Sequence, residues 1–137
     1  MSIWDSGHKT QRQILIVDIL SREKGYLHMN DLAARVGDLT LEPIPPEYFV
    51  DRRKFHDSAA RRVLTDDIKE ISLSDDFPKT FIRTEFRGVR LCTEAEIQKK
   101  ADKQRHAAKK LLYETNVLLR KAGRREQLRM EEFDNAQ

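Results

Sequence analysis

The chain has 137 residues, of which 39% are hydrophobic and 36% charged, so it fits one domain of ordinary size with one appended element. Its formal net charge of +3 is too small to indicate nucleic-acid binding by itself, and its single cysteine excludes an intramolecular disulfide. The longest apolar run, residues 14–17, is far too short to cross a bilayer, and the first residues lack the basic and apolar parts of a secretory signal. We therefore expect a cytoplasmic protein with no membrane partner.

A first helix is predicted over residues 10–23, because apolar side chains recur through this segment at helical spacing. Thr10 and Gln13 fit a capping box at its start, in which each side chain would bond the backbone N–H of the other. Gly25 is expected to close the helix, since glycine accepts the left-handed conformation that often follows a helix end. A short bridge or strand is expected at residues 26–27.

A second helix of about two turns is predicted from Asn30, whose side chain can cap it, to a stop at Gly37. Beyond it the helical pattern lapses, and residues 38–56 contain three of the four prolines. The Pro-Pro pair in this segment cannot lie inside a regular helix, because the backbone donor and the required preceding geometry are both missing. We interpret residues 38–56 as an insertion that packs against the domain, with one helical turn at residues 46–50.

A third helix is predicted over residues 58–71, with Asp57 or Ser58 as its cap. One stripe of this helix is apolar and should face the core, and it comprises Ala60, Leu64, Ile68 and Ile71. The opposite face should be exposed, and it comprises Arg61, Arg62, Thr65, Asp66 and Lys69.

A two-stranded hairpin is predicted over residues 81–91. Side chains alternate along residues 81–86, and Arg87 and Gly88 supply a turn. This pattern is typical of a ribbon at the edge of a domain.

A long helix is predicted from Thr93 onwards, because Thr93 and Glu96 fit a capping box and no glycine or proline follows until Gly123. It should have about 30 residues and a length of roughly 45 Å, at a rise of ~1.5 Å per residue. Its apolar stripe has heptad spacing, at Ile97, Ala101, Gln104, Ala108, Leu111, Thr115, Leu118 and Ala122. We predict that this helix forms a homodimer, and the alternative is that it folds back onto the first helix. The residues predicted to make the dimer contact are Ile97, Ala101, Ala108, Leu111, Leu112, Leu118 and Leu119.

The long helix also carries a basic run over residues 99–110. Such a run could steer the dimer towards DNA or RNA. More often a charge run of this kind is the solvated back of a coiled coil, and we favour that interpretation.

The order of helix, short helix, helix and hairpin, with the strings RRVLTDDIKEI and GVRL, resembles the N-terminal winged helix of the DeoR-type and WYL-type bacterial regulators. Residues 67–68 match an acid and an aliphatic residue in the third helix of that family, and residues 88–91 match the end of its wing. The resemblance covers roughly residues 10–92 and implies a winged helix that binds DNA. Just before the acid, where the family carries two basic residues, this chain has Thr65 and Asp66, and a carboxylate there weakens the attraction to phosphate.

The predicted fold class is therefore mainly α with a small β-hairpin. A winged helix-turn-helix domain would occupy residues 1–92 and include the insertion. The long C-terminal helix, as a dimerisation element with a frayed end, would occupy residues 93–137.

The predicted function is that of a dimeric transcriptional regulator that binds double-stranded DNA. Arg61 and Arg62 lie near the start of the third helix, where arginine can enter the major groove and read guanine. The basic residues before this helix and on the wing would hold phosphates. The residues predicted to contact DNA are Arg52, Arg53, Lys54, Ser58, Arg61, Arg62, Thr65, Lys69, Arg83, Arg87 and Arg90.

Two alternatives stay open. A nearly neutral winged helix could be a protein-interaction module, inhibitory or scaffolding and encoded by a phage or mobile element, with no DNA binding. The insertion or the long helix would then bind the partner. The arginines could also belong to an ordinary solvated surface and pair with Asp51, Asp57, Asp66, Asp67 and Glu85. For Arg90, a structural role at the edge of the domain is as well supported as a phosphate contact.

No enzyme activity is expected. The four histidines are scattered without ligand spacing, and the single cysteine has no second cysteine with which to bind zinc. No glycine-rich phosphate loop or nucleophile motif occurs, so no metal or cofactor is predicted.

Overall fold

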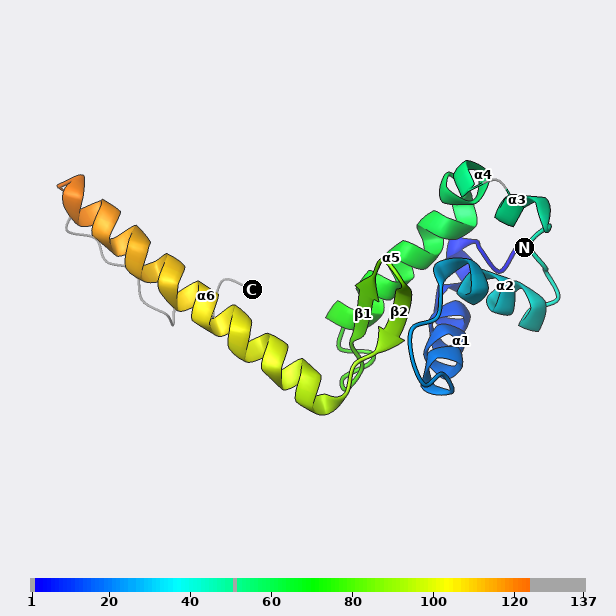
Figure 1. Cartoon of the computed structure of the whole chain (residues 1–137), viewed down its shortest axis with the longest axis horizontal. Helices are drawn as coiled ribbons and strands as arrows, with labels where there is room; N and C mark the ends of the chain where they lie inside the picture. The colour runs from blue at the N-terminus through cyan, green and yellow to red at the C-terminus, as the bar shows by residue number, and fades with distance from the viewer. Residues whose placement is uncertain (1, 51, 124–137) are drawn as a thin grey trace. The chain divides into compact units, whose positions relative to one another are not determined.

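The computed structural model describes residues 2–50 and 52–123, apart from the side chain of Arg52. The chain forms two compact units, Met1–Thr93 and Glu94–Gln137. The described residues form helices and one two-stranded antiparallel hairpin, and the second unit contains a long helix (Figure 1). The predicted class, mainly α with a small β-hairpin and a long C-terminal helix, is therefore confirmed.

Three helices build the core of the first unit. A short 3-10 turn, η1 (Ser6–His8), leads into α1 (Lys9–Ser21), against which α2 (Met29–Leu39) and α5 (Ala59–Leu73) pack. Burial of each large aliphatic side chain in such a core contributes about 1.5–3 kcal/mol. The helices bury their apolar stripes completely at Ile16, Leu32, Val36, Leu64 and Ile71.

The predicted caps of α1 are wrong at both ends. Its N-cap is His8, which makes no side-chain cap bond; Thr10 lies inside the helix, and Gln13 turns into the core. At the other end, the backbone N–H of Arg22 bonds to carbonyls of the last turn, and Gly25 follows without a left-handed φ. The preceding 3-10 turn replaces the predicted capping box, and the chain leaves α1 in a right-handed conformation that needs no glycine.

The predicted cap and stop of α2 are also wrong. His28 is the N-cap, because its Nδ1 accepts a hydrogen bond from the backbone N–H of Asn30 at 3.1 Å. The helix continues past Gly37, which is buried where the chain crosses back over it. A Cβ at Gly37 would lie 2.7 Å from the carbonyl oxygen of Glu42. Close backbone approach, rather than a helix stop, is therefore the reason for glycine at this position.

The segment predicted as an insertion contains two short helices, α3 (Glu47–Val50) and α4 (Arg52–His56). The first confirms the helical turn predicted at residues 46–50, whereas α4 was predicted as irregular chain. Phe55 of α4 is buried, and its ring centroid lies 5.3 Å from that of Phe49. The segment packs against the domain, as its aromatic residues predict.

Helix α5 begins where the sequence predicts. Ser58 Oγ accepts a hydrogen bond from the backbone N–H of Arg61 at 3.2 Å, which confirms Ser58 as the cap. The predicted apolar stripe faces the core, and its buried members are Leu64, Ile68 and Ile71. One charged residue, Asp67, shares this buried stripe.

The predicted hairpin consists of β1 (Ile82–Glu85) and β2 (Gly88–Leu91), joined by residues 86–87. The turn lies one residue earlier than predicted, because Gly88 already pairs with Glu85 as the first residue of β2. The loop therefore has two residues, the commonest length for an antiparallel hairpin.

A third extended segment lies beside β2. Leu27 forms an antiparallel bridge with Val89, and the backbone N–H of each residue donates to the carbonyl of the other at 2.9 Å. This confirms the bridge predicted at residues 26–27. Gly88 adopts a φ of 128°, and a Cβ there would run into the Leu27 carbonyl, so the bridge needs glycine at this position.

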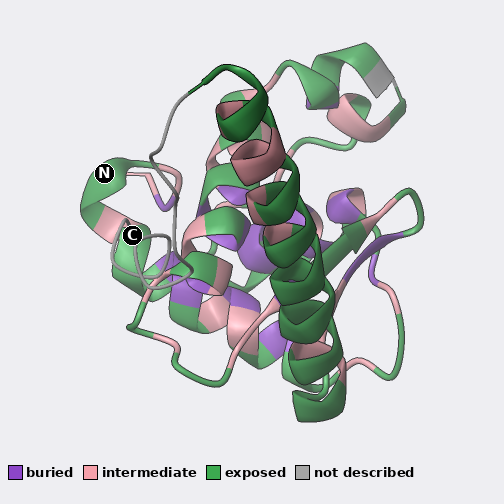
Figure 2. Cartoon of the chain, turned by 90° about the vertical axis from the view of Figure 1, so that its left-hand side faces the viewer, coloured by how far each residue is buried: buried purple, intermediate pink, exposed green. Residues whose placement is uncertain are grey.

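The second unit contains α6 (Glu94–Lys121), a helix of 28 residues that confirms the predicted long helix. No described residue of α6 is buried, in contrast to α1, α2 and α5 of the first unit (Figure 2). The frayed end predicted for the chain lies outside the described residues. Within the described ranges, no helix is both long and apolar enough to span a membrane.

Candidate nucleic-acid interface

An ion pair buried between α1 and α5 decides which face of α5 reaches solvent. Arg12 donates from Nε and Nη2 to the two carboxylate oxygens of Asp67 at 2.6 and 3.1 Å, and their side chains are only 4% and 3% exposed. Gln13 donates to the same carboxylate, and Arg12 Nη1 donates to the backbone carbonyls of Ile3 and Asp5. The possibility that Asp67 pairs with the surface arginines is therefore wrong.

The outer face of α5 carries three basic residues whose charges are available. Arg62 and Lys69 are exposed and Arg61 is half-buried, and none of them forms an ion pair with a described residue. An arginine that no carboxylate holds can bond phosphate or guanine in a bidentate way without first losing a partner. The alternative in which the surface arginines pair with neighbouring acids is thus not found for Arg61 and Arg62.

Asp66 is an exposed acid on the same helix, but it lies on a different side from Arg61. Asp66 lines a shallow depression together with Lys69, Glu70 and Leu73. Arg61 and Thr65 instead line a groove between α5 and β1. The acid that departs from the family pattern therefore does not face the hairpin.

Two polar residues predicted to contact DNA bond to the backbone of the chain. Ser58 Oγ donates to the carbonyl of Phe55 at 2.6 Å, and Thr65 Oγ1 donates to the carbonyl of Arg61 at 2.9 Å. Their hydroxyl donors are therefore occupied within the chain. We expect them to contribute less to an interface than the basic residues of α5.

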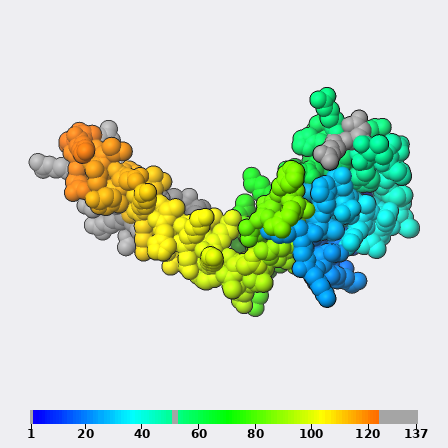
Figure 3. Space-filling model, in the orientation of Figure 1, coloured from blue at the N-terminus to red at the C-terminus, as the bar shows by residue number. Residues whose placement is uncertain are grey.

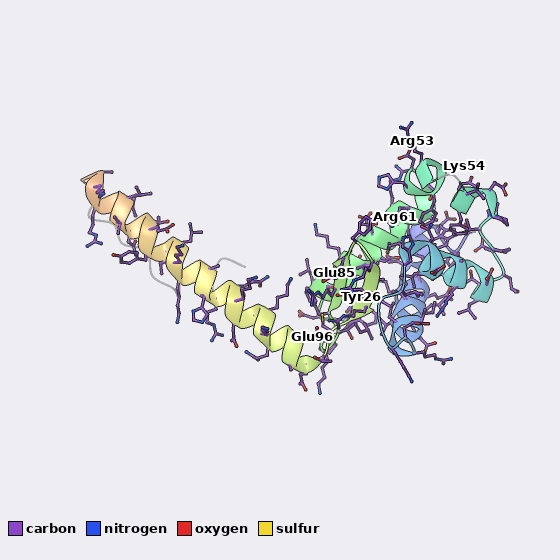
Figure 4. The ribbon with its side chains drawn as sticks, in the orientation of Figure 1. Tyr26, Arg53, Lys54, Arg61, Glu85 and Glu96 are labelled. Carbon is purple, nitrogen blue, oxygen red and sulfur yellow. The ribbon has the colours of Figure 1, made fainter. Side chains whose placement is uncertain are left out.

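Helix α4 places more basic residues just before α5. Arg53 and Lys54 are exposed, and both lie at the α4 end of the first unit, with Arg61 further along α5 (Figure 4). The ammonium group of Lys54 lies 4.9 Å from the ring centroid of Tyr48, a cation–π contact that orients it. The side chain of Arg52 lies outside the described residues.

The hairpin presents its basic residues differently, because one carboxylate lies among them. Glu85 pairs with Arg83 at 2.6 Å and with Arg87 at 3.4 Å. Its pKa is lowered from the ordinary value of 4.5, first by a hydrogen bond from the Tyr26 hydroxyl and then by the two arginines, against an opposing effect of desolvation. Figure 4 labels Glu85 and Tyr26 in this cluster, and Figure 3 shows the hairpin at the surface of the first unit.

The ring of Tyr26 also holds two guanidinium groups. Those of Arg87 and Arg90 lie 4.8 and 5.2 Å from its centroid. Arg90 Nη1 additionally donates to the backbone carbonyl of Leu91 at 3.2 Å. The structural role that the sequence leaves open for Arg90 is therefore present.

The sequence analysis did not predict the roles of Arg12, which binds Asp67, and of Tyr26, which contacts Glu85, Arg87 and Arg90. Arg12 could have been found, because it lies four residues before Ile16 on the buried stripe of α1, where a charge requires a buried partner. Tyr26 offered no comparable signal. Its position beside the wing follows from the pairing of Leu27 with β2, which sequence spacing does not give.

The residues predicted for dimerisation lie along α6, and none of them is buried. Leu111 and Leu118 are 56% and 66% exposed, and Ala101 is also exposed. The others are half-buried, namely Ile97, Ala108, Leu112 and Leu119.

Comparison of the chain with models of protein families, with curated proteins and with solved structures found no match. The resemblance to the DeoR-type and WYL-type regulators therefore stays a prediction. Among the described residues, no group of three or more histidine, cysteine, aspartate or glutamate side chains is placed to hold a metal ion.

Proposed function

We propose that this protein binds double-stranded DNA, with α5 in the major groove and the hairpin against the phosphate backbone. The observation that carries the proposal is the pair Arg61 and Arg62 at the start of α5, which form no ion pair with a described residue. Arginine near the start of such a helix can bond guanine O6 and N7, with about 1–3 kcal/mol of discrimination for each good contact. The buried position of Asp67 keeps a second carboxylate off this face.

The other basic residues would position the duplex rather than read it. Lys69 lies two turns after Arg61 on α5, and Arg53 and Lys54 precede the helix on α4. On the hairpin, Arg83 and Arg87 can turn from Glu85 to phosphates. Contacts of this kind supply affinity that depends on salt and carries no sequence information.

We also propose that α6 joins two copies of the chain, so that the protein acts as a dimeric transcriptional regulator in the cytoplasm. The support is the heptad spacing of its leucines together with their exposure. A two-fold dimer would present two α5 helices to successive major grooves, and the operator should be an inverted repeat. Replacement of Leu111 and Leu118 by glutamate should convert the dimer to a monomer in sedimentation experiments, whereas a wild-type monomer would contradict this part of the proposal.

Charge reversal tests the DNA proposal. The double variant R61E/R62E should bind a fluorescent duplex at low salt at least about tenfold more weakly than the wild type, since it replaces two phosphate-attracting groups by repelling ones. The variant K24E/K79E changes the net charge equally at exposed lysines outside the proposed interface and should retain most of the affinity. An R61E/R62E protein that remains dimeric and binds DNA as tightly as the wild type would contradict the role of Arg61 and Arg62. A dimeric wild-type protein that binds no DNA would support the protein-interaction alternative.

A further inference from the structure

We infer that the groove between α5 and β1 is a docking site for an extended peptide that presents both apolar and acidic side chains on one face. The inference goes beyond DNA binding, because it concerns a different class of partner. It rests on three features of the groove: an open strand edge, an apolar floor, and basic side chains without an acid among its lining residues.

The open strand edge belongs to β1. In its ladder with β2, Glu85 pairs with Gly88 across the two-residue loop, and the hydrogen-bonded pairs then alternate, so Thr84 belongs to a pair that exchanges no backbone bonds. Its partner Val89 uses its own N–H and carbonyl on the opposite side, with Leu27. The N–H and carbonyl of Thr84 therefore point away from β2, towards the outer edge.

Helix α5 closes one end of this edge and leaves the rest open. Ser72 Oγ accepts a hydrogen bond from the backbone N–H of Ile82 at 3.0 Å, so the end of α5 covers the first outward donor. No described residue bonds the next outward donor, the N–H of Thr84. An exposed strand edge of this kind can accept another extended segment through main-chain hydrogen bonds.

The floor of the groove is apolar. The groove has a volume of about 300 Å³, enough for a few side chains, and Met29, Ile68, Ile82 and Phe81 contribute to its lining. Leu73 stands at its margin with 72% of its surface exposed. In a strand added at β1, every second side chain would point to one face, so alternate apolar residues of the partner could enter the groove.

The charges of the groove select an acidic partner. Arg61 and Lys69 line it, no carboxylate does, and neither cation forms an ion pair with a described residue. Carboxylates at groove-facing positions of the peptide, between its apolar residues on the same face, would meet these two cations in charge-assisted contacts. A basic peptide would be repelled, so charge decides the occupant.

A binding experiment with the full chain can test this site. The probe is a fluorescein-labelled decapeptide with leucine and glutamate in turn at every second position and serine between them, so that both kinds of side chain share one face. The control probe carries lysine at each glutamate position. Anisotropy should show saturable binding of the acidic peptide and at least about tenfold weaker binding of the basic one, a difference that a favourable and an unfavourable charge contact produce. Amide hydrogen exchange at Thr84 should slow when the acidic peptide is bound.

Two substitutions separate strand addition from simple charge attraction. T84P removes the outward N–H but keeps the ladder with β2, because proline is tolerated at an edge position whose N–H faces solvent. It should weaken binding of the acidic peptide at least about fivefold, the scale of one hydrogen bond, whereas the matched control T84A should stay within about twofold of the wild type. K69E should weaken binding about tenfold or more and serves as the test if T84P does not fold.

Peptide binding at the groove and DNA binding by α5 can be tested separately. T84P lies outside the proposed base-reading residues, so its DNA affinity should stay within about twofold of the wild type while its peptide affinity falls. Peptide binding that is absent from the wild type, equal for the acidic and basic probes, or unaffected by both T84P and K69E would overturn the docking site. Loss of self-association in T84P would show that a second copy occupies the edge, and it would overturn the peptide as occupant.

Discussion

Helix α5 and the hairpin each carry three basic residues, but the two regions offer them to a partner in different states. On α5, Arg61, Arg62 and Lys69 form no ion pair with a described residue; Asp67 is turned inwards to Arg12, and Glu70 pairs with Lys9. On the hairpin, Glu85 lies among Arg83 and Arg87 and holds both. Asp67 is buried away from the basic residues of α5, whereas the half-buried Glu85 lies among those of the hairpin, so the two regions differ in how much of the same formal charge is available.

The largest expected effect comes from breaking the buried pair beneath α5. D67A should lower the free energy of unfolding by about 3–5 kcal/mol, because it leaves Arg12 buried with an uncompensated charge. Chemical denaturation measures this change. The matched control is D66A, the exposed acid next to it, which should change stability by no more than about 0.5 kcal/mol. Equal effects of the two substitutions would contradict the role assigned to the buried pair.

Removal of one arginine from each region sharpens the comparison. R62Q should reduce affinity for duplex DNA by about tenfold, since the wild-type side chain is free to bond. R87Q should reduce it by only about twofold, because Arg87 must first leave Glu85 and the ring of Tyr26. Titration of each variant and of the wild type into the same labelled duplex measures the two losses of affinity. If R87Q lost more DNA affinity than R62Q, the basic residues of the hairpin would be more available to DNA than those of α5, contrary to our proposal.

Neutralisation of the acid on the hairpin should raise DNA affinity. E85Q releases Arg83 and Arg87 and removes a charge that repels phosphate, and we expect a gain of up to about fivefold, the scale of one exposed ion pair. E47Q on α3 makes the same change in net charge away from the hairpin and should have less effect. If E47Q raised DNA affinity as much as E85Q does, the gain would come from the net charge of the protein and not from the release of Arg83 and Arg87.

The smallest expected effect concerns the hydroxyl group that bonds Glu85. Y26F should raise the pKa of Glu85 towards its ordinary value of 4.5, because the hydrogen bond from Tyr26 is the largest cause of its depression. Since this pKa is lower in the folded state, the contribution of Glu85 to stability is present above about pH 4.5 and is lost as the pH falls through the folded pKa. Carbon-detected NMR titration of both proteins measures the pKa of Glu85. An unchanged pKa in Y26F would contradict the hydrogen bond from the Tyr26 hydroxyl to Glu85.

Local patterns in the sequence predicted most of the fold. The stripe of α5, the hairpin and the long uninterrupted run of α6 are each set by periodicity within one element, and each is found in the structure. Helix caps were predicted less well. Several residues within a few positions can each cap a helix, as with Asn30 and the observed cap His28, and the choice depends on the path by which the chain enters.

The candidate site was harder to predict than the fold, because its charge pattern depends on contacts between distant elements. Arg12 and Asp67 are 55 positions apart, and Tyr26 and Glu85 meet only because Leu27 pairs with β2. The sequence correctly placed Arg62 and Lys69 on the exposed face of α5, whereas Arg61 is half-buried. It could not tell which carboxylates would lie beside them.

The salt dependence of DNA binding tests the central proposal most directly. The wild-type protein should bind duplex DNA, and the logarithm of its association constant should fall linearly with the logarithm of salt concentration, by about 0.9 for each phosphate that its basic residues neutralise. The free cations of α5 predict that R61Q/R62Q flattens this slope more than R83Q/R87Q does. A wild-type protein that does not bind at low salt, or whose affinity does not depend on salt, would contradict the proposal that this surface binds DNA.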